Sequence, residues 1–283
     1  MLDISFEFHN FNLQTICENA SILIIGDRTS EKTTLIKNLA NEMYRNNLID
    51  STIIISPTEK FNNTYDVEKY YDNYDSKIIR QLLDKQDKDR KDNILSKYLI
   101  ILDDCNTNNI SKDENLIELL FNGRHYNITT IFAMQYPLGL PPALRVNFDY
   151  VFLFEMNIMT NKKKTYEHYL GMFPTFKSAD HIFKKMKNHT ACVVINKGVH
   201  HTILEKCQLY KAQEQKKFLP PTIIIDEYDD QNDETNLSKI DIITNIMVNQ
   251  LKIQKKIMEN ENLIKDMNET NMELIKLFKE MIV

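Results

Sequence analysis

The sequence has no tryptophan, only 5 glycines among 283 residues, and no long apolar run. A helix that crosses a membrane needs about 18 to 20 consecutive apolar residues, and no stretch of the chain approaches that length. The first residues, MLDISFEFHN, also lack the basic and then apolar layout of a signal peptide. We therefore expect a soluble protein with no membrane partner.

Cysteine is scarce and its spacing is uninformative. No two of the 4 cysteines form a CxxC pair, which argues against a zinc site and against a disulfide framework. His168, His181 and His189 likewise show no metal-ligand spacing. We expect reduced thiols and structural or surface histidines.

The chain has no excess of positive charge. Its net charge is −5, and residues 1–210 hold 25 Lys/Arg against 26 Asp/Glu. Contact with nucleic acid therefore requires local patches. Lysines at 162–164 and at 184, 185 and 187, on two helices expected within 160–188, form such patches or simply solvate a helix face.

The stretch that organises the chain is SILIIGDRTSEKTT, residues 21–34. An apolar strand is followed by Gly26, a polar loop, Lys32, Thr33 and a run with helical period. This order matches the phosphate loop GxxxxGK[ST], in which backbone N–H groups and the lysine hold phosphates and the hydroxyl helps to hold Mg²⁺.

The second glycine of that loop is missing, because Glu31 stands in its place. A carboxylate close to a triphosphate costs several kcal/mol in a poorly solvated site unless it is neutralised or turned away. Either the loop binds a nucleotide in an altered way or it has lost this ligand.

A second apolar strand, YLIILDD, ends in Asp103 and Asp104. Asp103 is placed to hold a Mg²⁺-bound water beside the phosphate loop, and Asp104 to orient the attacking water. Acidic turns after strands are common in α/β proteins, so a purely structural role is the alternative. The spacing of about 70 residues from Lys32, with a strand at 52–55 between them, is that of RecA-like ATPases.

A third strand, ITTIFAMQ, ends in Gln135, whose amide would lie near a terminal phosphate. Arg124 precedes this strand and is a candidate arginine finger for its own or a neighbouring subunit. Strands and helices alternate as in an α/β fold with a mainly parallel sheet. Two short strands around a turn at Gly198 are expected to form a hairpin that closes the domain.

The set IIG…KTT, LIILDD, NGRHYNITTIFAMQY and LPPALRVNFDYVFLF, in this order, resembles the poxvirus-type genome-packaging ATPases of the FtsK–HerA superfamily. The resemblance covers about residues 18–200. It implies a RecA-like P-loop NTPase fold, ATP and Mg²⁺ as ligands, a ring-shaped homo-oligomer, and translocation of double-stranded DNA into a capsid. It also implies a location in the host cytoplasm, at the viral factory, or in the virion.

The resemblance also assigns roles to matching positions. Those expected to contact the nucleotide are Gly26, Lys32, Thr33 and Thr34, and those expected to hold Mg²⁺ are Thr33 and Asp103. Asp104 would activate water, Gln135 would sense the nucleotide, and Arg124 would be the finger. Arg145 fits the pattern without a defined role.

Two other functions remain open at the level of sequence. The first is a catalytically impaired P-loop paralogue, a structural or interaction protein of the virion or packaging machinery; Glu31 motivates it. The second is a different P-loop motor, such as a helicase-like protein, although we find no strand-separating element.

The expected organisation is an ATPase domain at 1–210, a polar acidic linker at 211–238, and an amphipathic helix at 239–283. From about Ile240 the last segment carries a heptad pattern of apolar residues, which favours a coiled coil. A long helix folded back on the core is the alternative. Such a helix would supply oligomerisation or a docking site for a capsid or packaging partner.

Overall fold

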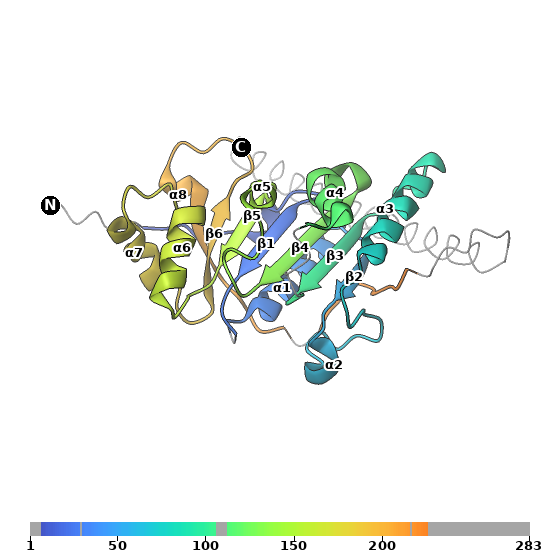
Figure 1. Cartoon of the computed structure of the whole chain (residues 1–283), viewed down its shortest axis with the longest axis horizontal. Helices are drawn as coiled ribbons and strands as arrows, with labels where there is room; N and C mark the ends of the chain where they lie inside the picture. The colour runs from blue at the N-terminus through green and yellow to red at the C-terminus, as the bar shows by residue number, and fades with distance from the viewer. Residues whose placement is uncertain (1–6, 29, 106–111, 216, 226–283) are drawn as a thin grey trace, which may run out of the picture. The chain divides into compact units, whose positions relative to one another are not determined.

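A seven-stranded sheet forms the centre of the computed structural model, which describes residues 7–28, 30–105, 112–215 and 217–225 (Figure 1). The strand order is β2-β3-β4-β1-β5-β6-β7. The bounds are β1 (Ser21–Ile25), β2 (Ser51–Ile55), β3 (Tyr98–Asp103), β4 (Ile128–Met134), β5 (Tyr150–Leu153), β6 (Thr190–Ile195) and β7 (Cys207–Lys211). The expected α/β fold with a mainly parallel sheet is confirmed.

The first five strands in the sheet order are parallel, and their register aligns their carboxyl ends. Ile25 pairs with Met134, and Asp103 pairs with Ala133. Residues that follow β1, β3 and β4 in the chain are therefore brought to one edge of the sheet. Each of these strands is an apolar run because both of its faces are covered.

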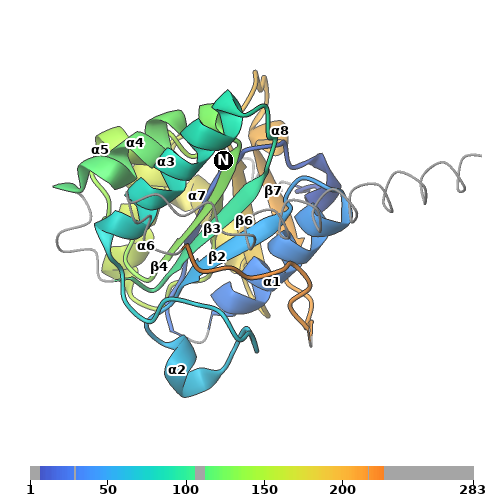
Figure 2. The same ribbon diagram turned by 90° about the vertical axis from the view of Figure 1, so that its right-hand side faces the viewer.

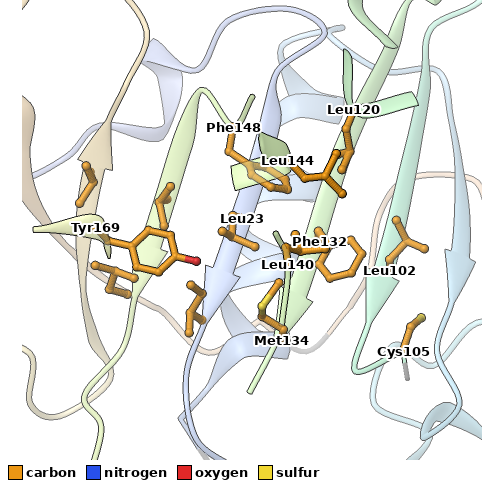
Figure 3. Packing of buried hydrophobic residues seen from close by; sticks show 14 of the residues in the cluster. Leu23, Leu102, Cys105, Leu120, Phe132, Met134, Leu140, Leu144, Phe148 and Tyr169 are labelled. Carbon is orange, nitrogen blue, oxygen red and sulfur yellow. The ribbon is translucent and has the colours of Figure 1, made fainter. Parts of the chain in front are cut away.

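Helices cover both faces of the sheet, with α1 on one side and α3, α4 and α5 on the other (Figure 2). Alternate residues of one strand enter opposite cores: Leu23 and Ile25 lie in one cluster, Ile22 and Ile24 in the other. Figure 3 shows the first cluster, where Phe132 and Phe148 pack beside Leu23. The bounds are α1 (Lys32–Arg45), α2 (Glu59–Asn62), α3 (Ser76–Lys91), α4 (Glu114–Asn122), α5 (Pro142–Arg145), α6 (Met159–Tyr169), α7 (Phe176–Lys185) and α8 (Ile203–Lys206), with 3₁₀ turns η1 (Leu13–Thr15) and η3 (Gly123–Tyr126).

The expected hairpin is present as β6 and β7, which are antiparallel, but its second strand starts later than the sequence suggested. Residues 203–206 form α8. Thr202 caps this helix: its hydroxyl accepts the N–H of Glu205, and the Glu205 carboxylate accepts the N–H of Thr202. This capping box T-x-x-E stabilises a helical turn where the apolar pattern alone indicated a strand.

The described chain beyond β7, residues 212–215 and 217–225, packs on the domain as a strap. Asn38 of α1 donates to the Gln213 carbonyl at 2.7 Å and accepts the N–H of Gln213 at 2.8 Å. Further along, Thr222 forms a parallel bridge with Thr52, a residue of the edge strand β2. Residues 212–225 belong to the segment expected to be a linker from residue 211; the domain boundaries at 210 and 238 stay predictions. The heptad segment 239–283 lies outside the described residues.

Among the described residues, no helix is long and apolar enough to cross a membrane.

The strap contacts lead to a stability prediction for Asn38, which is 1% exposed and also accepts the Tyr210 hydroxyl at 2.9 Å. Asn38→Ala removes three part-buried hydrogen bonds and should lower the free energy of unfolding by about 2–4 kcal/mol. Chemical denaturation measures it. Asn46→Ala, at the exposed end of α1, is the control and should cost less than about 0.5 kcal/mol. An equal loss of stability in Asn38→Ala and Asn46→Ala would contradict the view that the strap contacts stabilise the domain.

Candidate functional site

The loop after β1 is closed so tightly that only glycine fits at its first position. A Cβ atom on Gly26 would lie 2.3 Å from Ser30 Oγ and 2.8 Å from Phe154 Cβ. The Ser30 hydroxyl oxygen is buried and has no hydrogen-bond partner among the described residues. A buried polar atom without a partner carries a desolvation cost, so this loop holds an unused donor that a ligand oxygen would satisfy.

Lys32 begins α1 and its side chain turns back under the loop, where the residue is only 6% exposed. Its Nζ donates to the carbonyl oxygens of Gly26 at 3.0 Å and Asp27 at 3.2 Å. The same Nζ lies 3.9 Å from Oδ1 of Asp104. The ammonium is thus held between the phosphate-loop backbone and the acidic end of β3.

Asp103, the last residue of β3, is 3% exposed and faces the start of α1. Its Oδ2 accepts the Tyr65 hydroxyl at 2.7 Å and the Thr33 hydroxyl at 3.3 Å. Burial, and next the charge of Asp104, raises the pKa of Asp103 to about 6, against the lowering effect of Tyr65, Lys32 and Thr33. Oδ1 has no partner among the described residues.

Asp104 and Gln135 meet at the same edge. The Gln135 amide donates from Nε2 to Asp104 Oδ2 at 3.0 Å. Asp104 has a φ of 51°, an uncommon left-handed conformation for a residue without glycine's freedom. This turn keeps the Asp104 carboxylate close to Lys32 and Gln135 instead of continuing the strand.

The oxygens of Thr33 and Asp103 fit a magnesium ion, which prefers hard oxygen ligands and keeps several waters. The unpartnered Oδ1 of Asp103 offers an acceptor for such a water. The described residues contain no group of three or more His, Cys, Asp or Glu suited to a metal ion. A site here would therefore depend on oxygens of a bound phosphate as well.

Glu31 has a φ of 66°, the left-handed conformation that glycine adopts without cost. Its carboxylate accepts the hydroxyl of Thr34, and its Oε1 lies 3.7 Å from Nδ1 of His189. His189 precedes β6, which lies on the other side of β1 from β3. The Glu31 carboxylate therefore has His189 as a neighbour on the β6 side of the loop, and it engages the Thr34 hydroxyl.

No family model matches the chain. Over 227 residues it is 33% identical to the uncharacterized protein L437 of Acanthamoeba polyphaga mimivirus, covering 75% of this chain and 79% of that protein.

The chain belongs to the L437 family.

The uncharacterized protein 088R of invertebrate iridescent virus 3 is 30% identical to the chain over 199 residues, which cover 68% of this chain and 76% of that protein. Among solved structures, the genome packaging NTPase B204 of Sulfolobus turreted icosahedral virus 2, in complex with AMPPCP, superposes with a TM-score of 0.52 at 13% identity. That match covers 70% of this chain and all of B204. At this identity the likeness shows the fold alone, and this L437-family chain has a P-loop NTPase fold.

Six of the predicted site residues come together, namely Gly26, Lys32, Thr33, Asp103, Asp104 and Gln135, whereas the Thr34 hydroxyl donates to Glu31. Arg124 does not join them. It lies in η3 before β4, and its guanidinium is 3.9 Å from Asp149, which precedes β5. At about 3.3 Å per residue, the length of β4 separates it from Gln135 by roughly 20 Å. Arg145 also lies elsewhere, stacked over the ring of Tyr169 at 5.7 Å.

The sequence analysis missed Tyr65 and Glu59, which contribute to this site. Tyr65 is fully buried and donates to Asp103. Glu59, at the start of α2, is 2% exposed and accepts the backbone N–H groups around Tyr65. Both residues lie in the polar stretch between β2 and α3, which has no apolar period to indicate a buried side chain. The only sequence signal was a Pro-containing segment directly after β2.

The conformation of Glu31 gives a prediction that needs no ligand. Glu31→Gly and Glu31→Ala both lose the bond to Thr34, but only glycine adopts φ of 66° without strain. Glu31→Gly should therefore be more stable than Glu31→Ala by about 1 kcal/mol. Urea denaturation of the two variants measures the difference. Equal stability would show that the loop changes conformation once the carboxylate is removed.

Proposed function

We propose that this L437-family chain is a viral DNA-packaging ATPase that couples ATP hydrolysis to the translocation of double-stranded DNA into the capsid. The observation that carries the proposal is the convergence of Lys32, Thr33, Asp103, Asp104 and Gln135 at the end of the phosphate loop. The fold shared with B204, a genome packaging NTPase, supports it.

In this proposal the loop and α1 bind the phosphates of ATP. Lys32 exchanges the carbonyls of Gly26 and Asp27 for the terminal phosphates, and the backbone N–H groups from Gly26 onward surround them. Thr33 and Asp103 hold Mg²⁺. The bound ion supplies neutralisation of charge on the phosphate oxygens.

Asp104 orients the attacking water as a general base, because its carboxylate lies at the phosphate-loop lysine without being buried like Asp103. Gln135 senses the nucleotide through its bond to Asp104, because a water that donates to this carboxylate displaces the amide. The pair therefore links the occupied state of the site to the end of β4.

The contact between Asp104 and Gln135 continues to the basic helix α6. Tyr136 follows Gln135, and Lys164 of α6 lies over its ring at 4.9 Å from the centroid. Lys162, Lys163 and Lys164 are the local patch available on α6 for DNA phosphates. We propose that movement of Gln135 is passed to this helix and so to double-stranded DNA.

A ring-shaped homo-oligomer follows from the same proposal. Arg124 is roughly 20 Å from its own site, so it acts only as a finger that enters the site of a neighbouring subunit. The segment 239–283 is proposed to dock a capsid or packaging partner. Such a protein works in the viral factory of the host cytoplasm or in the virion.

A second candidate function rests on Glu31. A non-glycine residue in left-handed conformation, in the position of the loop's second glycine, is what a catalytically impaired paralogue would tolerate. In that case the chain keeps the fold as a structural or interaction protein of the packaging machinery.

The deciding experiment is binding and turnover of Mg²⁺·ATP by the purified chain, with and without double-stranded DNA, beside Lys32→Ala. We expect DNA-stimulated turnover that falls by about 100-fold or more in the variant, because the phosphates lose their buried cation. Lys37→Ala, further along α1, is the control. Absence of binding at roughly millimolar ATP would favour the impaired paralogue, and turnover indifferent to DNA would remove the translocation proposal.

Asp104→Asn separates binding from chemistry. The amide keeps the size of the carboxylate but cannot accept a proton from water, so turnover should fall by about 100-fold. Nucleotide affinity should stay within about threefold, since Lys32 and Thr33 remain. Calorimetric binding and a phosphate-release assay give the two numbers. Asp84→Asn, an exposed carboxylate of α3, is the matched control. Undiminished turnover in Asp104→Asn would refute the assigned role.

A further inference from the structure

Tyr65 contributes to the candidate site although it lies outside the phosphate loop, α1, β3 and β4, which carry the other site residues. It lies in the connection between α2 and α3, its side chain is fully buried, and its hydroxyl donates to Asp103 Oδ2 at 2.7 Å. Burial, and next the charge of Asp103, raises the pKa of Tyr65 well above its usual value. The hydroxyl therefore keeps its proton and remains a donor throughout the physiological range.

The position of this hydroxyl is fixed by the backbone on which it stands. The buried carboxylate of Glu59 accepts the N–H groups of Thr64 at 2.9 Å, Tyr65 at 2.8 Å and Asp66 at 3.2 Å. Three bonds to one ionised group hold this turn more firmly than neutral partners would. Among the described residues, the hydrogen bonds of the Glu59 carboxylate all go to the backbone of residues 64–66, so this carboxylate holds the turn that carries Tyr65.

The Tyr65 ring is held from its other side by the strap. The ring of Phe218 packs edge-on against it, with centroids 5.7 Å apart and planes at 87°. The backbone flanking Phe218 is in turn bound by Asn41 of α1, which donates to the Lys217 carbonyl and accepts the N–H of Leu219. Two separate segments of the chain therefore position one hydroxyl group.

The consequence falls on Asp103. A carboxylate with one partner can rotate, but here the Tyr65 and Thr33 hydroxyls both donate to Oδ2. This leaves Oδ1 buried and without a partner among the described residues. A buried acceptor without a hydrogen bond lowers the stability of the fold by about 1–3 kcal/mol. Such a cost indicates that Oδ1 binds a ligand in the active protein.

We propose that Tyr65 is a positioning residue that fixes Asp103 through Oδ2, so that Oδ1 is presented to the hydration shell of Mg²⁺. The inference rests on the proposed ATPase function and deepens it, since it concerns the metal side of the same site. The alternative is a bond that only stabilises the fold, as another tyrosine–aspartate pair does. Tyr74 donates to Asp113 at 2.6 Å, and Asp113 caps α4, where it also accepts the Ser76 hydroxyl and the N–H groups of Asn115 and Leu116.

The test compares Tyr65→Phe with Tyr74→Phe, each of which removes one hydroxyl that donates to an aspartate. Binding of a non-hydrolysable ATP analogue is measured in Mg²⁺ and again in chelator, together with thermal unfolding. In Tyr65→Phe we expect affinity in Mg²⁺ to fall about tenfold, as one hydrogen bond to a charged group would give. Affinity in chelator should change less than about twofold.

Tyr74→Phe should change neither affinity, even where its thermal unfolding shifts as much as that of Tyr65→Phe. Glu59→Gln keeps one acceptor oxygen, places an amide N–H₂ against at least one of the three backbone N–H groups and removes the charge, so it should weaken Mg²⁺-dependent binding about threefold. Equal losses in Mg²⁺ and in chelator, or no loss in Tyr65→Phe, would overturn the positioning role alone. A wild-type chain that binds no analogue in either condition would overturn the proposed function with it.

Discussion

The buried ammonium of Lys32 is the group on which the rest of the site depends. An isolated cation in the interior is very costly, and it persists only with partners that replace water. Here the partners are two loop carbonyls and the nearby carboxylate of Asp104. Asp103 in turn is more acidic than its burial alone would allow, because Lys32, Thr33 and Tyr65 favour its charged form. The loop, the start of α1 and the end of β3 therefore hold their positions together.

Much of this arrangement could be predicted because fully buried parallel strands have a simple sequence signature. The runs at 22–25, 53–55, 98–103, 128–134 and 150–153 are apolar and bounded by polar or turn residues, and each became a strand of the sheet. Once parallel strands are assumed, residues directly after them share one edge, which is how Asp103, Asp104 and Gln135 could be placed. The same rule puts Arg124, directly before a strand, at the opposite edge. The sequence therefore predicted at which edge of the sheet each of these residues lies within one subunit.

The remainder depends on contacts between segments far apart in the chain. Tyr65 lies in a polar stretch with no periodic pattern, and its burial needs Glu59 beneath its backbone and Phe218 against its ring. The strap was interpreted as a linker because it is polar and rich in proline. It is nevertheless held because two buried asparagines of α1 bind its backbone groups. Backbone recognition leaves no trace in the sequence of the segment that is recognised.

Glu31 shows how a fold accommodates a residue that its motif does not favour. The left-handed conformation that glycine would take is kept, at a cost of about 1–2 kcal/mol. The carboxylate, which would oppose a polyphosphate, instead accepts the Thr34 hydroxyl and lies 3.7 Å from His189 Nδ1. The helix amino terminus adds a favourable partial charge to the same carboxylate. The carboxylate that replaces the glycine therefore has partners within the chain, and Lys32, Thr33, Asp103, Asp104 and Gln135 keep their mutual contacts beside it.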